Sequence, residues 1–373
     1  ATIIKLDSTG NLTDSIHIEN PGREGSIGVL VPIDSSQIIA LGSWSCDSTA
    51  FLWYLLLDQD LNILVEKMIY SENRIVHNFN YVFNHNGYLV FLAHHFQNNE
   101  VSFEDICFYE MTLDGIVLQD TFYSRPPTGN TGYMILENGW DSTYIVSTYS
   151  PLNTTTRTGY VHHLDTSFNV IEFYGLIADY VTFPNSAKWQ TDSVYIYTGR
   201  KFTGVGNDRD VGILRVSIDD SVLNYQYTGK LDTIEFPGIY RSLDFLTSEN
   251  IFFGYTTNTE YFPFQYFPSW IALSIFDSTL NLKDELFYGG DAYYLVNSIL
   301  ATQDSGCVIA CTRFDYLAGS DVWDVYILKV NKDGLLVNLS EKEYRYRDNC
   351  QVYPNPGIDK LMIIAPARNS IFQ

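Results

Sequence analysis

Aromatic side chains cluster in the segment 260–270, EYFPFQYFPSW, and could form a ligand-binding surface. Tyr and Trp offer an apolar ring face and a polar tip, which suits them to stack on sugar rings or to clamp a peptide. The alternative is that this segment folds over and packs on its own part of the protein. A further Trp stands in the polar stretch 43–50, SWSCDSTA. The aromatic ligand-binding candidates are Trp44, Tyr261, Phe264, Tyr266 and Trp270.

Three basic residues stand in or beside stretches with loop-like composition, namely Arg200, Lys201 and Arg313. A guanidinium group can donate two parallel hydrogen bonds to a carboxylate, so a basic rim could recognise a uronic acid or a peptide terminus. The alternative is that these charges are solvated and paired with acidic neighbours such as Asp208 or Asp315. We count the three basic residues among the ligand-binding candidates.

His94 and His95 are adjacent at the end of an expected strand, where either could serve as a general base or a metal ligand. Successive side chains of a strand point to opposite faces, so at most one of them faces a given site. No calcium loop, zinc motif, phosphate loop, nucleophile elbow or dinucleotide fingerprint is present. Acidic residues are too numerous to select a catalytic pair. We therefore keep both His as ligand-binding candidates and assign no catalytic residue, no metal and no cofactor.

The net charge of the chain indicates which classes of molecule it can bind. The chain carries 44 Asp and Glu against 22 Lys and Arg, a formal net charge of -22. Such a surface repels phosphate backbones and anionic lipids, which argues against nucleic acid as a partner. No apolar run approaches the roughly 20 residues that span a bilayer, so we expect no membrane insertion. The five Cys have no zinc-site spacing. We expect the protein to be a monomer.

The elements that position these candidates are repeated along the chain. Related stretches recur at intervals of 51 to 60 residues, each led by Asp, Asn, Ser or Thr and each followed five residues later by Leu, Ile or Val. Such lead side chains bond to backbone N–H groups and favour a tight turn between strands. The lead residues are Asp7, Asp58, Thr112, Asp165, Ser217, Asp277 and Asn331.

A second hairpin pattern precedes six of these turns, so that a unit of about 54 residues holds four strands. Helical patterns are absent, and β-branched and aromatic residues fill the periodic stretches. The sequence therefore predicts an all-β protein, a β-propeller of four-stranded antiparallel blades over residues 1–346. Residues 1–18 supply half a blade, and six full units follow. We predict seven blades, with six blades plus an extra hairpin as the alternative.

Longer, irregular connections alternate with the short repeated turns. In a propeller blade the two kinds of connection lie on opposite faces, and binding usually resides on variable loops held by a rigid scaffold. All ten ligand-binding candidates fall in or beside the longer connections, such as 93–105 and 255–270. We therefore place any site on the long-loop face, around the central channel.

The last part of the chain departs from the repeat. The stretch VYPNP at 352–356, followed by IDKLMII, resembles the opening of the C-terminal sorting domain of the type IX secretion system in Bacteroidetes. Residues 350–373 are therefore either the truncated start of such a domain or strands that close the propeller. The chain also starts at Ala1 inside an expected strand, and we interpret it as a fragment or a processed form.

The repeat resembles that of secreted Bacteroidetes propellers, whose blades carry an Asp and a basic residue before the turn. Asp105, Asp210 and Asp324 stand seven residues before their turns, and Arg215 and Lys329 match the basic position. The resemblance implies export to the medium or the outer cell surface. It assigns no activity.

We therefore expect a secreted or cell-surface binding module that recognises a glycan or a protein. One alternative is an extracellular carbohydrate-active enzyme, a glycoside hydrolase or lyase with acids lining the channel. Another is a structural adhesin segment without a ligand site. Whether the chain is an enzyme stays open, and the lack of a catalytic motif weighs against it.

Overall fold

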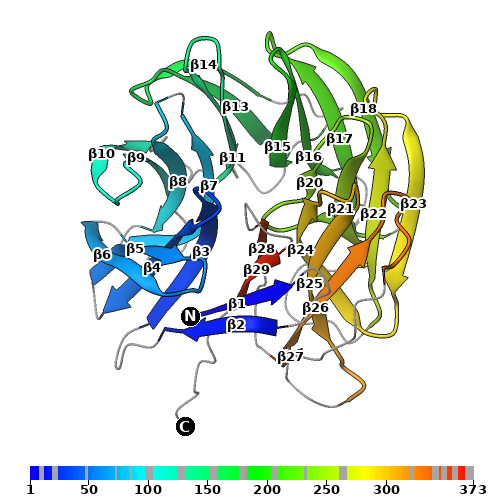
Figure 1. The fold of residues 1–373 in the computed structure, drawn as a ribbon. Helices are drawn as coiled ribbons and strands as arrows, with labels where there is room; N and C mark the ends of the chain where they lie inside the picture. Colours follow the sequence, from blue (N-terminus) through cyan, green and yellow to red (C-terminus); the bar gives the residue numbers. More distant parts are fainter. Residues whose placement is uncertain are drawn as a thin grey trace.

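The computed structural model of the 373-residue chain is a ring of small antiparallel sheets (Figure 1). Every regular element within the described residues is a β-strand, and no helix there could cross a membrane. The all-β propeller of four-stranded blades is therefore confirmed. The structure describes residues 1–7, 12–18, 24–46, 49–71, 74–84, 86–96, 104–123, 131–150, 158–175, 181, 183–202, 209–230, 233–259, 267–318, 323–337, 344–345, 351–354 and 360–365.

Six sheets each come from one continuous stretch of chain. The first three are β3 (Glu24–Pro32), β4 (Gln37–Cys46), β5 (Thr49–Asp58), β6 (Ile63–Ser71); β7 (Arg74–Phe83), β8 (Leu89–Phe96), β9 (Glu104–Met111), β10 (Val117–Tyr123); and β11 (Thr131–Glu137), β12 (Tyr144–Ser150), β13 (Thr158–Leu164), β14 (Val170–Gly175). The next three are β15 (Phe183–Thr191), β16 (Val194–Phe202), β17 (Arg209–Ser217), β18 (Val222–Thr228); β19 (Phe236–Pro237), β20 (Leu243–Asp244), β21 (Ile251–Thr257), β22 (Trp270–Phe276), β23 (Leu282–Gly289); and β24 (Tyr293–Ala301), β25 (Cys307–Phe314), β26 (Trp323–Val330), β27 (Tyr344–Arg345).

One further sheet joins the two ends of the chain. Its strands, in sheet order, are β2 (Leu12–His17), β1 (Thr2–Asp7), β29 (Lys360–Ala365) and β28 (Gln351–Pro354). Strand β1 pairs with β29 in antiparallel register, with Ile3 opposite Ile364. Ile3 packs into the apolar cluster of the β3–β6 sheet, and Ile4 and Leu6 pack against the β24–β27 sheet. The sheet of both chain ends therefore fills the space between these two blades.

The prediction of seven blades is wrong, and the alternative of six blades plus an extra hairpin fits the structure better. Six blades, not seven, are each built from one continuous unit of sequence. The N-terminal hairpin β1–β2 has no first and second strands of its own, and its free edge pairs instead with β29. The C-terminal strands thus lie in the ring, in the place of the missing first half of a blade.

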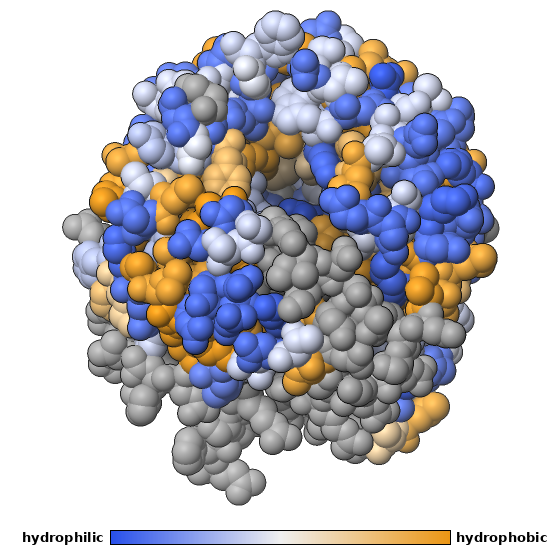
Figure 2. All heavy atoms as spheres, in the orientation of Figure 1, coloured by the Kyte–Doolittle hydropathy of each residue, from blue (hydrophilic) through white to orange (hydrophobic). Residues whose placement is uncertain are grey.

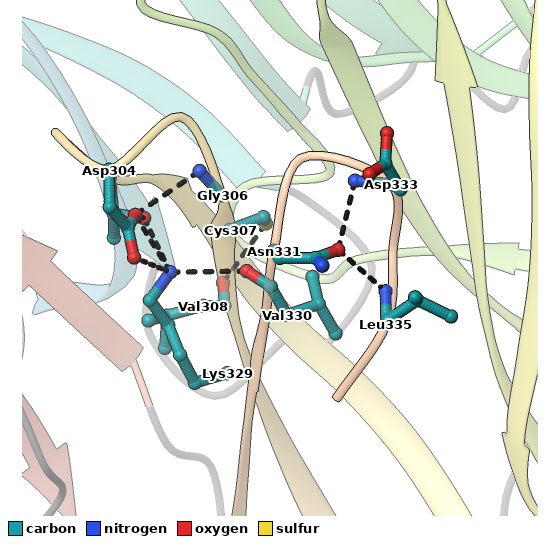
Figure 3. Close-up of polar contacts among 10 residues, drawn as sticks. Asp304, Gly306, Cys307, Val308, Lys329, Val330, Asn331, Asp333 and Leu335 are labelled. Atoms are coloured by element: carbon teal, nitrogen blue, oxygen red, sulfur yellow. Dashed lines mark hydrogen bonds and ion pairs between the residues drawn. The ribbon is translucent and has the colours of Figure 1, made fainter. Parts of the chain in front are cut away.

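The hairpin turn between the third and fourth strands has one geometry in all six continuous blades. The N–H of its lead residue donates to the carbonyl four residues on, at 3.0 Å between Asp58 and Asn62, for example. The Asp58 carboxylate accepts hydrogen bonds from the N–H groups of Asp60 and Asn62, both at 2.8 Å. Figure 3 shows the same arrangement at Asn331, whose Oδ1 accepts from Asp333 and Leu335, both at 2.9 Å. The predicted turn chemistry is therefore confirmed in these six blades, while the turn after Asp7 lies outside the described residues.

In the six continuous blades, the residue three after the lead adopts a positive φ, between 62° and 79°. Leu61, Phe168 and Leu280 fill that position with fully buried apolar side chains. In two other turns the position is Gly, and the neighbouring blade supplies the bulk: Tyr54 lies over Gly115 and Leu286 over Gly334. In these five turns the position thus receives one large apolar group, from one blade or from the other, whereas in the sixth turn it holds Asp220.

Lys329 explains why a basic residue recurs before the turn. Its Nζ lies 2.8 Å from Asp304 Oδ2 and donates to Thr302 Oγ1 at 2.8 Å and to the Val330 carbonyl at 3.1 Å (Figure 3). Arg215 donates to Gln190 Oε1 at 2.6 Å in the equivalent place of another blade. The repeated basic residue therefore links the two hairpins of a blade through its side chain, and its role is structural.

Candidate functional site

A cavity of about 230 Å³ lies at the centre of the ring. It is lined mainly by first strands of the blades, which stand nearest the ring axis, and by the segment between β19 and β20 (Figure 1). Figure 2 shows the ring hollowed near its centre, with hydrophilic side chains inside the hollow. The lining residues that can hydrogen-bond through their side chains are Asn80, Tyr81, Ser186, Lys188, Tyr240, Arg241, Asp244 and Ser298. We call this space the channel cavity.

Lys188 of β15 and Asp244 of β20 form an ion pair on the cavity wall. Lys188 Nζ lies 2.7 Å from Asp244 Oδ1 and also donates to the Phe245 carbonyl at 2.6 Å. Asp244 is nearly buried and accepts two backbone hydrogen bonds, from Phe245 N at 2.9 Å and from Ala301 N at 2.9 Å. Because three elements hold the carboxylate, its position on the cavity wall is fixed.

Arg241 and Tyr81 meet across the cavity from different blades. The guanidinium lies close enough to the phenol of Tyr81 to influence its pKa, and both side chains are only partly exposed. Burial raises the pKa of Tyr81, while the charge of Arg241 opposes that rise. The phenol therefore stays neutral at physiological pH and is available as a hydrogen-bonding group.

A network of hydroxyl groups holds the segment that carries Arg241. Ser242 N donates to Ser186 Oγ at 2.8 Å, and Ser242 Oγ lies 2.6 Å from Thr198 Oγ1. Asn185 Nδ2 donates to the Ile239 carbonyl at 3.1 Å. All four polar side chains are buried. Buried polar groups that satisfy one another specify a single arrangement, so this network positions the 239–244 segment against β15 and β16.

The blade interface between β11–β14 and β15–β18 holds a second group of titratable side chains. His163 Nε2 lies 2.9 Å from Asp220 Oδ2, and Tyr195 OH lies 3.3 Å from Asp220 Oδ1. The contact with Asp220 raises the pKa of His163. Asp220 occupies the positive-φ position of its turn, where the other described turns carry an apolar residue or Gly. This interface is therefore polar where its counterparts are apolar.

A cavity of about 300 Å³ between β15–β18 and β19–β23 is lined by Asp210, Glu285 and the edges of both sheets. Glu285 Oε1 accepts hydrogen bonds from Tyr255 OH at 2.7 Å, from Ser274 Oγ at 3.2 Å and from Thr228 Oγ1. These donors come from both blades, so the carboxylate links the two sheets. Among the described residues, no group of three or more His, Cys, Asp or Glu side chains is placed to hold a metal ion.

Several predicted site residues are packed within a blade or between two neighbouring blades. Trp44 is buried and meets Trp53 edge to face, with ring centroids 4.7 Å apart. Arg200 is buried, and its guanidinium lies 3.4 Å from the ring centroid of Phe236. Lys201 Nζ lies 4.1 Å from the ring centroid of Tyr227. These contacts are cation–π and aromatic packing interactions within the scaffold.

Arg313 and Trp270 are likewise placed away from the channel cavity. Arg313 lies 3.3 Å from Asp291 and 3.4 Å from Asp315, which is the pairing given above as the alternative for this residue. Trp270 begins β22, and Lys230 lies 5.9 Å from its ring centroid. Of the predicted candidates that the structure describes, none lines the channel cavity.

The remaining candidates lie outside what the structure describes. Tyr261, Phe264 and Tyr266 fall in the segment 260–266, which is outside the described residues. His94 and His95 belong to β8, where their backbones pair with Ile106 and Asp105. Their side chains are outside the described part. The prediction for these five residues therefore stays a prediction.

No sequence pattern singled out Tyr81, Lys188, Arg241 or Asp244, which line the channel cavity. Three of the four stand in strands, where polar residues among apolar ones look like ordinary strand faces. One signal was available: the longest interval between turns, from Ser217 to Asp277, marks extra residues, and Arg241 and Asp244 lie inside it.

Comparisons with known proteins support the class that the fold defines, a β-propeller. No family model matches the chain, and no curated protein matches it either. Similar solved structures include a protein of unknown function from Dyadobacter fermentans, with TM-score 0.51, 9% identity, and 84% of this chain and 94% of that chain covered. A polysaccharide lyase of family PL25, an ulvan lyase, has TM-score 0.51 and 11% identity, with 82% and 78% covered. At these identities the likeness concerns the fold alone.

Proposed function

We propose that this chain is a binding module that recognises carbohydrate in the channel cavity. The observation that carries the proposal is the cavity wall, where hydroxyl, phenol, amide, ammonium, guanidinium and carboxylate groups from several blades converge. A concave site with a few fixed polar groups is the usual form of a small-ligand site. The fold is also that of a polysaccharide lyase, which is consistent with a carbohydrate ligand.

The cavity wall carries the kinds of group that bind a sugar. A sugar ring presents hydroxyl groups in several directions and an apolar face, and it needs both donors and acceptors at fixed positions. Lys188 and Asp244 supply a fixed donor and a fixed acceptor, and the rings of Tyr81 and Tyr240 supply aromatic surface. The longer connections predicted on the long-loop face would contact the rest of a longer glycan.

A glycan array probed with the purified chain tests the proposal. We expect binding to a subset of glycans, and we expect Tyr240→Ala, which removes one aromatic ring from the cavity wall, to weaken it. Tyr225→Ala, which removes an exposed tyrosine on an outer strand, is the matched control. Failure of every glycan to bind, or equal loss with both variants, would contradict the proposal and favour the structural adhesin.

A carbohydrate-active enzyme is the second candidate. It is favoured by the Tyr81–Arg241 pair, because a phenol beside a guanidinium can exchange a proton with a bound sugar while the cation stabilises negative charge. Incubation of the chain with neutral and acidic polysaccharides, followed by assays for new reducing ends and new double bonds, separates the two. Binding without either product supports the binding module.

We also propose that the protein is exported to the medium or the outer cell surface. The support is the resemblance of the repeat and of the VYPNP stretch to exported Bacteroidetes proteins. Fractionation of the producing cells, with protease treatment of intact cells, tests this. Recovery of the protein only from the protected cytoplasmic fraction would overturn it.

A further inference from the structure

We infer that the channel cavity is selective for a single sugar residue that bears a carboxylate, with Arg241 as the residue that recognises the acid group. This inference rests on the proposed function and deepens it, because it names the class of sugar and the part of the glycan that enters the cavity.

The first support is the charge of the cavity wall. Among its described lining residues two are cationic, Lys188 and Arg241, and one is anionic, Asp244. The wall therefore carries an excess of positive charge, in a chain whose formal net charge is -22. Lys188 already lies 2.7 Å from Asp244, and the three charged side chains of the wall together carry one positive charge in excess. A net positive cavity in an acidic protein favours an acidic ligand.

The second support is the partner set around Arg241. Its guanidinium shares the wall with Tyr81, a neutral phenol that can itself donate to a carboxylate oxygen. Ser298 lines the same wall and is the bridge partner of Arg241. A guanidinium beside hydroxyl donors can bind both oxygens of a carboxylate, which is the geometry that Arg provides and Lys does not.

The third support is the fixed backbone of Arg241. Its carbonyl accepts a hydrogen bond from Ile299 N at 2.9 Å, and the neighbouring Tyr240 N donates to the Asn297 carbonyl at 2.8 Å. Strand β24 therefore holds this segment on one side and the hydroxyl network holds it on the other. A site whose groups are already in place loses little conformational freedom on binding.

The size of the cavity limits how much of a glycan can enter. Its volume of about 230 Å³ lies below the roughly 300–1,000 Å³ typical of pockets for drug-sized ligands. A space of this order holds one sugar residue. The part of the ligand that enters the cavity is therefore a single sugar residue.

Calorimetric titration with matched sugars tests the inference. The probes are methyl glycosides of glucuronic, galacturonic and mannuronic acid, each compared with its neutral counterpart, in which the carboxylate is replaced by a hydroxymethyl group. We expect at least one acid to bind about 10- to 100-fold more tightly than its neutral partner, the range expected for a hydrogen-bonded charge pair. That preference should shrink as salt is added, because salt screens the charges.

Substitutions of Arg241 test whether this residue causes the preference for acidic sugars. Arg241→Gln should bring acid and neutral sugar to similar affinity, and Arg241→Lys should restore part of the preference through its charge. The matched control is Arg215→Gln, which removes a guanidinium from the scaffold contact with Gln190. It should leave the preference unchanged. Thermal unfolding of each variant shows whether it is folded.

The outcomes separate the inference from the proposed function. Equal binding of acid and neutral sugars by the wild-type chain overturns the inference and leaves carbohydrate binding standing. Absence of binding by every sugar and every arrayed glycan overturns both. Binding of acetate as tightly as of the uronic acids overturns the inference, because the site would then recognise a small anion without a sugar. Should Arg241→Gln fail to fold, the comparison of matched sugars on the wild-type chain still decides.

Discussion

The hairpin turns and the channel cavity are both products of the same repeated unit, but their residues follow different rules. At the turns, the lead residue plays one structural part in every continuous blade, and the positive-φ residue does so in five of the six. In the cavity, the blades contribute different groups, such as Tyr81, Lys188 and Arg241. The residues that hold neighbouring blades together recur from blade to blade. The residues that line the cavity differ from blade to blade.

Asp220 is a turn residue whose contacts resemble those of the channel cavity. It stands in a repeated turn but contacts His163 and Tyr195, as a cavity residue would. Changes at the repeated turn positions should alter stability, and changes in the cavity should alter binding with little effect on stability.

The largest effect is expected from Phe168→Ala at the positive-φ position. The ring is buried, stacks on Phe108 at 5.4 Å between centroids and joins two blades. Its removal should lower the free energy of unfolding by about 3–5 kcal/mol, as is usual for a buried aromatic side chain. Urea denaturation measures this, with Phe173→Ala as the control because Phe173 is 44% exposed. Equal losses in the two variants would contradict the interfacial role of this position.

A smaller loss is expected from Gly115→Ala. Gly115 has a φ of 79°, and a Cβ there would come within 2.9 Å of the Tyr54 ring of the neighbouring blade. Backbone strain and steric overlap together should cost about 2–4 kcal/mol. Gly87→Ala is the control, since Gly87 has a φ of 76° and nothing within 4 Å of the added carbon. It should cost about 1–2 kcal/mol. The difference in unfolding free energy between the variants isolates the contact with the neighbouring blade.

A pH dependence should distinguish the polar turn from the others. The folded pKa of His163 lies above its ordinary value of 6.5, so the folded chain holds this proton more tightly than the unfolded chain. The resulting stability is fully present below pH 6.5 and is lost as the pH rises through the folded pKa. Asp220→Asn should remove this loss, about 0.5–1.5 kcal/mol, because Asn tolerates the positive φ but carries no charge. Urea denaturation at several pH values checks it, and an unchanged pH profile in the variant would contradict the assignment.

The smallest effect on stability is expected in the cavity. Tyr81→Phe removes one hydroxyl group that lies close to the guanidinium of Arg241. The free energy of unfolding should fall by less than about 1 kcal/mol, while affinity for the sugar ligand should fall several-fold. Calorimetric unfolding and titration of the same sample test both parts. A stability loss as large as that of Phe168→Ala would show that the cavity wall is scaffold as well.

The turns could be predicted from sequence because their chemistry is local. An Asp such as Asp58 bonds to N–H groups two and four residues away, so its type and spacing carry the whole signal. The cavity could not be predicted because its contacts join distant blades. Lys188 meets Asp244 fifty-six residues later in the chain, and nothing near Lys188 indicates that partner.

Contacts between distant residues also explain why several predicted site residues lie away from the channel cavity. Arg200 looked like a loop cation because it begins the polar stretch 199–210. In the structure it is the last part of a long strand, β16, and its guanidinium stacks on Phe236 of the next blade. The ring could be expected from the number of units, but which side chains face its axis depends on strand register, and each blade shifts its register by bulges such as that between Ile27 and Val29.

The pairing of β1 with β29 has a consequence for how the chain folds. Each continuous blade can form from residues close in sequence, which is fast, whereas this sheet requires the two ends of the sequence to meet. The entropy lost on closing so long a loop must be recovered by the contacts of Ile3, Ile4 and Leu6 with the two flanking blades. Docking of the N-terminal hairpin onto the C-terminal strands is therefore expected to be the late, rate-limiting event, and a circularised chain should refold faster than the linear one.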